Sequence, residues 1–186
     1  MKKSILLLFA FIIYNNNFAQ ETIHSTEFKY KKSNVDPRTS TINQYVVIPM
    51  DSLTAKQAYD LILFNIKDIY DSPSEVISAS EDDTFIKING VAPNLLSFKS
   101  IGRMAFADIH YTLEIRFKDE RIKIDLSRLD NATDYGFRSA ALLYTHKKNG
   151  KKNKIWELTG GIITDYFNEL VKSLTKRNKN TNLENW

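Results

Sequence analysis

Cysteine is absent from this sequence of 186 residues, and glycine and proline are scarce. Without cysteine the chain has no disulfide bond, thiolate zinc site, iron–sulfur cluster or cysteine nucleophile. A bacterial lipoprotein is anchored through a lipid-modified cysteine. We therefore expect that the chain, if it is exported, is not a lipoprotein. No glycine-rich phosphate-binding loop occurs either, so we expect no cofactor.

Residues 1–19 have the composition of a secretory signal peptide. A charged start is followed by the apolar run Ile5–Tyr14 and by the small residue Ala19. The run has 10 residues, whereas a bilayer-spanning helix needs about 20, so we expect cleavage after Ala19 or, as second choice, after Gln20. An uncleaved anchor is the alternative. Cleavage predicts a periplasmic or secreted protein with no membrane span in the mature chain. Such a protein would have no steady supply of ATP or NAD(P)H.

The charge of the mature chain is close to balanced. Removal of the signal peptide takes away two lysines and lowers the formal charge from +4 to +2. Residues 51–83 hold eight acidic side chains and two lysines, while residues 146–154 are rich in lysine. A split of this kind is typical of solvated surface. The near-neutral total argues against a nucleic acid partner.

The composition, with 42% hydrophobic residues, predicts a single domain, which we place at residues 44–176. The polar segment 20–43 has no sustained periodicity, and we expect a mobile lead or an edge segment there. Residues 44–49 are typical of a strand. Residues 54–57 have the form of a capping box, and an apolar stripe behind them predicts a helix of about four turns.

Four strands are expected after this helix. Residues 76–80 and 84–90 have strand composition on either side of an acidic turn. Residues 91–104 are expected to form an irregular connection. Two long strands with alternating apolar residues follow, at 107–117 and 122–126.

The alternation in these long strands determines the register of their hairpin. Apolar residues are odd-numbered in the first strand and even-numbered in the second, so a shared apolar face requires a loop with an even number of residues. A loop of two residues at 119–120 or of four at 118–121 sets Ile115 opposite Ile124.

The same register arranges the charges on the polar face of the hairpin. Glu114 falls opposite Asp125, and Arg116 falls opposite Lys123, which makes two pairs of like charge. On the diagonals, Glu114 neighbours Lys123 and Arg116 neighbours Asp125. We therefore expect charges that compensate one another, and solubility alone would explain them.

The remainder of the chain contains a long basic connection and a helix. Residues 129–154 are too long for a structureless loop, so we expect a short element within them. An apolar stripe from Ile163 to Leu174 predicts the last helix, and Gly160-Gly161 is expected to mark its start or a break within it. Residues 177–186 form a polar tail.

The order of elements is therefore strand, helix, four strands, helix. Each helix has one apolar stripe, and the long hairpin has one apolar face. The predicted fold class is α+β, with an antiparallel sheet of about five strands and both helices packed on one face.

Four stretches resemble an exported bacterial family that is defined only as a domain of unknown function with a TATA-binding-protein-like (TBP-like) fold. These are SLTAKQAYD (52–60), SPSEVI (72–77), FKDERIKI (117–124) and KIWELTGGIITDYFNELVKSL (154–174), which includes Trp156. The resemblance covers about residues 44–176 and implies the fold, without an activity or catalytic residues. The lysine-rich connection before Trp156 is longer than the resemblance implies.

The histidines are the main candidates for chemistry. They are His24, His110 and His146, and none has a second ligand at a metal-binding spacing, so we expect no metal site. His110 lies near Asp108 on the polar face of the first long strand, and a base oriented by a carboxylate is a catalytic arrangement. A strand face open to water gives little desolvation, which favours an exposed surface histidine.

The function that the sequence favours is a non-catalytic binding module of the cell envelope. The partner is an unidentified envelope protein or ligand, bound by the polar sheet face or by the long connection. The expected partner face contains Lys87, His110, Arg116 and Lys123. Two alternatives remain open. One is a small hydrolase that uses His110 and Asp108. The other is a pocket for an apolar ligand between helices and sheet, with residues 140–144 as its lid. The sequence leaves the oligomeric state open.

Overall fold

The structure, a computed structural model, describes residues 24–32, 39–100, 103–133, 136–139, 142–144 and 154–177. The expected signal peptide, most of the tail and much of the lysine-rich connection lie outside the described residues. Among the residues described, no helix is both long and apolar enough to cross a membrane.

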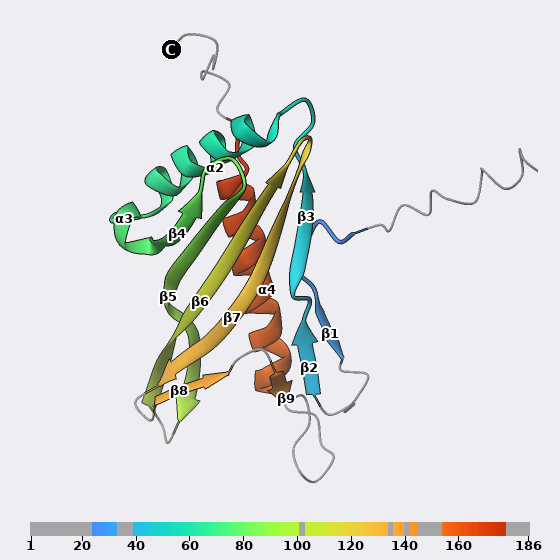
Figure 1. The fold of residues 1–186 in the computed structure, drawn as a ribbon. Coiled ribbons are helices and arrows are strands. Elements are labelled where there is room, and N and C mark those ends of the chain that lie inside the picture. Colours follow the sequence, from blue (N-terminus) through green and yellow to red (C-terminus); the bar gives the residue numbers. More distant parts are fainter. Residues whose placement is uncertain are drawn as a thin grey trace, which may run out of the picture.

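An antiparallel main sheet forms the centre of the molecule (Figure 1). Its strands lie in the order β3-β7-β6-β5-β4, and β8 also pairs with β7. The strands are β3 (Tyr45–Pro49), β4 (Ile77–Glu81), β5 (Phe85–Ser100), β6 (Arg103–Lys118), β7 (Arg121–Thr133) and β8 (Gly136–Ser139). The helices are α2 (Ala55–Ile69), the short α3 (Pro73–Val76) and α4 (Lys154–Leu174). The predicted fold class is confirmed, and so is the predicted order for the five-strand sheet and the two long helices; helix α3 and the additional short strands that precede β3 were not predicted.

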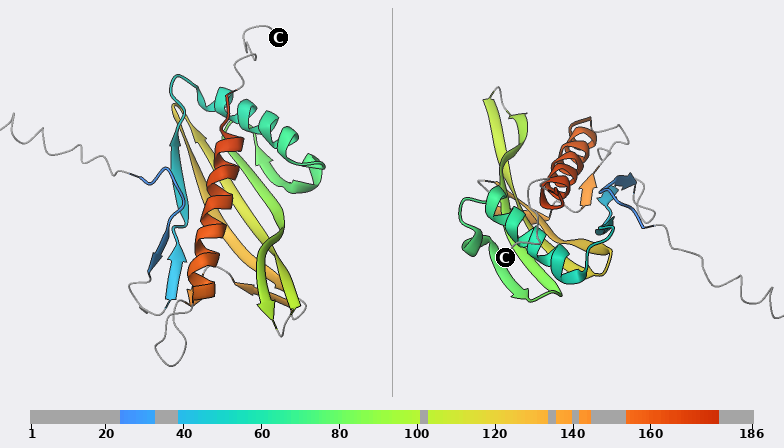
Figure 2. Two further views of the ribbon diagram at one scale, coloured as in Figure 1. Left: turned by 180° about the vertical axis from the view of Figure 1, so that it is seen from behind. Right: turned by 90° about the horizontal axis from the view of Figure 1, so that it is seen from above.

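Both long helices cover the same face of the main sheet (Figure 2). Tyr59 of α2 packs on Phe117 of β6 with ring centroids 5.3 Å apart, and Phe167 of α4 packs on Tyr111 of β6 at 5.2 Å. Phe117 and Tyr111 are both odd-numbered and lie on one face of the strand. The opposite face, which we call the outer face, is turned away from the helices. The core includes the fully buried side chains of Phe28, Phe167, Ile62, Ile66, Ile86, Ile88, Ile109, Leu113, Ile115, Ile122 and Ile124.

The start of α2 is held by the predicted capping box and by the long hairpin. The Thr54 hydroxyl accepts from the Gln57 N–H, and the Gln57 side chain accepts from the Thr54 N–H. Asp119, in the hairpin loop, accepts from the Ala55 N–H at 2.9 Å. This carboxylate lies where the helix dipole is positive, so it also stabilises the helix electrostatically.

The predicted register of the β6–β7 hairpin is confirmed. Ile115 lies opposite Ile124, Glu114 opposite Asp125 and Arg116 opposite Lys123. The loop is the two-residue form, Asp119–Glu120, because Lys118 pairs with Arg121. Glu120 has a φ of 63°, in the left-handed region that such a tight turn requires of one residue.

The expected irregular connection at residues 91–104 is wrong, because β5 continues through Ser100 and β6 begins at Arg103. The register shifts between Ala92 and Leu96, and Asn94 within this bulge has a φ of 52°. Asp108 on β6 accepts from the Asn94 N–H at 2.7 Å. The bulge interrupts the alternation of side chains, which explains why the sequence pattern resembles a loop.

Part of the polar leading segment belongs to the packed molecule. A second, three-stranded sheet contains β1 (Tyr30–Lys32), β2 (Thr39–Ile42) and β9 (Leu142–Tyr144). Phe28 is 1% exposed and packs edge-on against Phe167 of α4. The packed unit therefore begins before Gln44, since an aromatic side chain of the leading segment completes the core under the last helix.

The last helix starts earlier than its apolar stripe indicates. α4 runs without interruption through Gly160 and Gly161, so the expectation of a start or break there is wrong. Gly160 is buried beside the ring of Tyr30, and a Cβ atom at this position would overlap that ring. Close approach of Tyr30 therefore accounts for a glycine inside the helix.

The connection at residues 129–154 contains short strands, as predicted. β7 continues to Thr133, β8 pairs with it, and β9 pairs with β2. The segment proposed as a lid, residues 140–144, therefore contributes β9 to the small sheet, and its first two residues lie outside the described part.

Candidate functional site

The outer face carries a network of ion pairs on three neighbouring strands. Lys87 of β5 lies 3.3 Å from Glu114 of β6, and Arg116 of β6 lies 3.2 Å from the same carboxylate. Asp125 of β7 lies 2.9 Å from Arg116 and 2.7 Å from Lys123. The diagonal Arg116–Asp125 contact is present as the register predicts, while Glu114 binds Lys87 on its other side. The network brings together three of the four residues expected on the partner face.

The two carboxylates of this network are less exposed than its cations. The side chains of Glu114 and Asp125 are 21% and 18% exposed, whereas that of Arg116 is 52% exposed. Isolated exposed ion pairs contribute about 0–1 kcal/mol each, and several charges joined in a network, as here, can add to stability. The arrangement presents positive groups to solvent above partly covered negative ones.

A hollow of about 370 Å³, which we call the basic pocket, lies beside this network at the β6–β7 hairpin. It is lined by His24, Val47, Arg116, Lys118, Arg121, Ile122 and Lys123. Four of these seven residues carry a permanent positive charge. The lining of the pocket is therefore strongly basic.

Strand pairing explains how the pocket is built. Lys123 of β7 lies between Val47 of β3 and Arg116 of β6, so the three residues form one row across the outer face. Lys118 and Arg121 pair with each other next to this row, at the hairpin loop. Val47 thus supplies an apolar surface among the cationic side chains.

His24 lines the basic pocket on the side of β3 and contacts Tyr45. The Tyr45 hydroxyl lies 3.4 Å from His24 Nδ1, and the two rings are 5.8 Å apart. The ammonium of Lys123 lies over the Tyr45 ring, 4.3 Å from its centroid, a cation–π contact. Backbone pairing of Val47 with Ser25 at 3.0 Å holds the His24 segment against the edge of the sheet.

Lys118 and Arg121 differ from the other cations of the pocket. Arg116 and Lys123 share the carboxylate of Asp125. Within the described part of the chain, no carboxylate lies within ion-pair distance of Lys118 or Arg121. Like charges directly opposite each other in a sheet are destabilising, so this pair leaves a positive charge that an anionic ligand would neutralise.

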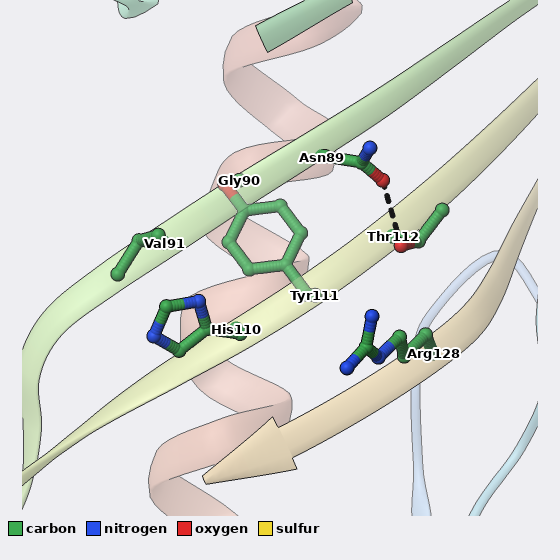
Figure 3. Close-up of a pocket in the computed structure, with 7 residues that line it drawn as sticks. All are labelled: Asn89, Gly90, Val91, His110, Tyr111, Thr112 and Arg128. Atoms are coloured by element: carbon green, nitrogen blue, oxygen red, sulfur yellow. Dashed lines mark hydrogen bonds between the residues drawn. The ribbon is translucent and has the colours of Figure 1, made fainter. Parts of the chain in front are cut away.

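The fourth residue of the expected partner face, His110, lies in a separate hollow further along the sheet (Figure 3). This hollow of about 240 Å³ is lined from β5, β6 and β7 by Asn89, Gly90, Val91, His110, Tyr111, Thr112 and Arg128. The structure does not bring His110 together with Arg116 and Lys123.

Asp108 and Thr112, which neighbour His110 on β6, each have a hydrogen-bond partner on β5. The carboxylate of Asp108 accepts from the Asn94 N–H in the β5 bulge. The Thr112 hydroxyl donates to Asn89 Oδ1 at 2.8 Å (Figure 3). Asp108 therefore has a structural role in holding the bulge, which accounts for its place in the strand.

Three tyrosines occupy the space between the helices and the main sheet. The Tyr111 hydroxyl lies 2.8 Å from that of Tyr70 and 3.4 Å from that of Tyr166. Burial raises the pKa of Tyr70 to about 12 and raises the pKa of Tyr111 further. These rings fill the place that the apolar-ligand alternative assigns to a pocket. Among the described residues, no three histidine, aspartate or glutamate side chains gather in a way that could hold a metal ion.

Sequence reasoning did not identify five of the seven residues that line the basic pocket: His24, Val47, Lys118, Arg121 and Ile122. The hairpin parity contained the signal for Lys118 and Arg121, since a two-residue loop places them opposite each other on the outer face. His24 had no such signal, because its position depends on the docking of the leading segment.

No family model and no curated protein matches the sequence. Among solved structures, the chain is similar to a DUF4468 family protein from Bacteroides ovatus, with a TM-score of 0.54 and 11% identity over 75% of this chain and 89% of that one. A TBP-like protein from Parabacteroides distasonis matches with a TM-score of 0.46 and 12% identity over 72% of this chain and 92% of that one. The expected resemblance to a domain of unknown function is confirmed by the first of these at the level of the fold.

Proposed function

We propose that this protein is an exported, non-catalytic binding module of the cell envelope, and that it binds an acidic partner through the outer face at the β6–β7 hairpin. The observation that carries the proposal is the excess of positive charge there. Arg116, Lys118, Arg121 and Lys123 line one hollow. Asp125 pairs with Arg116 and Lys123. Lys118 and Arg121 have no carboxylate within ion-pair distance in the described part of the chain.

Charge of one sign in a concave site supports binding of a partner of opposite sign. Such a site raises the local concentration of an acidic ligand and steers its approach. The same hollow offers Val47 as an apolar contact, so an acidic partner would also bury carbon surface there.

The export part of the proposal rests on residues 1–19. We expect the protein in the periplasm or the medium, with a mature chain that begins at Gln20 or Glu21. Mass spectrometry of the N-terminal peptide from fractionated cells tests this. An intact N-terminus in the cytoplasmic fraction would contradict export.

Charge reversal tests the binding face. The double variant Arg116→Glu with Lys123→Glu should lose saturable capture of acidic components from an envelope fraction, while circular dichroism shows an unchanged fold. The control is Lys67→Glu with Lys176→Glu, because these exposed lysines lie outside the outer face and the change in net charge is the same. Equal capture by both double variants and the wild type would remove the outer face from consideration.

A small hydrolase is the second candidate, since His110 lies in a hollow together with Thr112 and Arg128. A histidine near a hydroxyl and a cation is a combination that hydrolysis can use. A panel of ester and phosphoester substrates tests it, with the variant His110→Ala as control. Activity that survives in His110→Ala would reject this assignment. The apolar-ligand alternative has no comparable support, because tyrosine and phenylalanine rings fill the space between helices and sheet.

A further inference from the structure

We propose that the basic pocket is a binding site for a single oxyanion, a carboxylate or a phosphate, on a small and partly apolar group about the size of a sugar ring. This inference rests on the proposed function, and it names the part of the acidic partner that enters the hollow. It also assigns the recognition to Lys118 and Arg121 rather than to the cations already paired with carboxylates.

Two cations of the hollow, Lys118 and Arg121, have no carboxylate partner in the described chain, and both lie next to the hairpin loop. Asp125 contacts Arg116 at 2.9 Å and Lys123 at 2.7 Å, so these two side chains are already neutralised in part. Lys118 and Arg121, cross-strand partners at the hairpin loop, retain their full charge toward the same hollow. A ligand oxyanion at this end would convert a repulsive pair into two charge-assisted hydrogen bonds.

The loop between these two cations is held against the start of α2. Asp119 accepts from the Ala55 N–H at the start of α2. The backbone of Glu120 pairs with Leu53 and Met50, which holds the loop against the preceding segment. The loop is therefore fixed in position at both acidic residues, and its backbone keeps Lys118 and Arg121 opposite each other.

The hollow also offers carbon surface on the side of β3. Val47 lies in the row beside Lys123, and the Tyr45 ring lies under the ammonium of that lysine. His24 closes this side, held there by its contact with Tyr45. A ring that carries an acidic substituent would place its carbon face toward Val47 and its oxyanion toward Arg121.

The size of the hollow limits the ligand. Its volume of about 370 Å³ is at the lower end of the range for small-molecule sites, which is about 300–1,000 Å³. A single sugar or amino acid unit fits such a volume, either free or at the end of a longer chain. Arg121 supplies a planar donor group that binds carboxylate and phosphate equally well in geometry.

Nuclear magnetic resonance titration of the full mature chain tests the inference, with three matched sugars at constant ionic strength. We expect glucuronate and glucose 6-phosphate to shift the backbone amides of Val47, Lys123 and the hairpin loop, and neutral glucose to shift none of them. The two charged sugars separate a carboxylate preference from a phosphate preference. An equal response to glucose would overturn the proposal, as would shifts spread evenly over the lysines of α2 and α4.

Substitution of the free cations gives the second measurement. The variant Lys118→Gln with Arg121→Gln should weaken binding of the charged sugars on the order of tenfold or more, the expected loss of hydrogen bonds to a charged group. The control, Lys67→Gln with Lys176→Gln, should bind as the wild type does. Unchanged affinity in the pocket variant would reject the site.

The two proposals fail in distinguishable ways. If the pocket binds charged sugars but no acidic envelope component is captured, the oxyanion site stands and the proposed function is wrong. If capture depends on Arg116 and Lys123 but the charged sugars do not bind, the binding face stands and the pocket assignment is wrong.

Discussion

Asn168 of α4 holds the backbone of Phe28 with both ends of its side-chain amide. Its Oδ1 accepts from the Phe28 N–H at 2.7 Å, and its Nδ2 donates to the Phe28 carbonyl at 3.1 Å. The amide thus makes the two hydrogen bonds to the Phe28 backbone that a neighbouring strand would otherwise make. This contact fixes the segment that also carries His24 to the edge of the basic pocket.

Replacement of Asn168 by alanine should therefore destabilise the fold. Two partly buried backbone groups would lose their partner, which costs about 1–3 kcal/mol in free energy of unfolding. Urea denaturation measures this. The neighbouring exposed variant Glu169→Ala is the control and should change stability by less than about 0.5 kcal/mol. Equal losses in the two variants would show that the Phe28 contact contributes nothing specific.

The two adjacent glycines of α4 should respond in opposite directions to alanine. Gly161→Ala should stabilise the protein by about 0.5–1 kcal/mol, because the new methyl group meets no atom within 4 Å and alanine favours a helix. Gly160→Ala should destabilise it by about 1–3 kcal/mol, because its methyl group would overlap the Tyr30 ring.

Thermal unfolding of both glycine variants is the measurement. A double-mutant cycle with Tyr30→Ala attributes the effect, since the cost of Gly160→Ala should fall when the ring is absent. A cost that is the same with and without the Tyr30 ring would contradict the close-approach explanation.

The tyrosine cluster predicts a loss of stability at alkaline pH. Burial raises the pKa of Tyr70 from 10.0 to about 12, so its hydroxyl stays protonated in the folded state where the unfolded chain has already lost the proton. A raised pKa in the folded state gives stability that is fully present below pH 10 and is lost as the pH rises toward about 12. The loss is about 3 kcal/mol for a shift of this size.

Ultraviolet absorbance of tyrosinate, combined with urea denaturation at each pH, measures this loss. Tyr70→Phe should flatten the decline in stability above pH 10, because phenylalanine does not titrate. A decline of unchanged steepness in that variant would assign the alkaline sensitivity to other groups.

Much of the main sheet followed from patterns that extend over a few residues. The capping box at Thr54 and the parity of the β6–β7 hairpin each depend on neighbours in the chain, and both are confirmed. The bulge near Asn94 could not be predicted in this way. It breaks the alternation, and the carboxylate that stabilises it comes from Asp108 on the next strand.

The candidate site, too, was only partly predictable from the sequence. The sequence placed Arg116 and Lys123 opposite each other and gave the sign of the charges around them. It did not separate His110 from this pair, because strand alternation shows which face a side chain occupies but not which hollow it lines. Nor did it indicate that Lys118 and Arg121 would have no carboxylate nearby in the described chain.

The sequence by itself determined the order of the main-sheet strands and long helices, the faces of these helices and the register of the long hairpin, because these depend on local periodicity. Only the tertiary structure decided that Phe28 belongs to the core and that His24 borders a basic pocket. Both depend on contacts between residues that lie far apart in the sequence. Phe28 gains its hydrogen bonds and its ring contact from α4, 140 residues further along the chain. A polar stretch without periodicity gives no local sign of that contact.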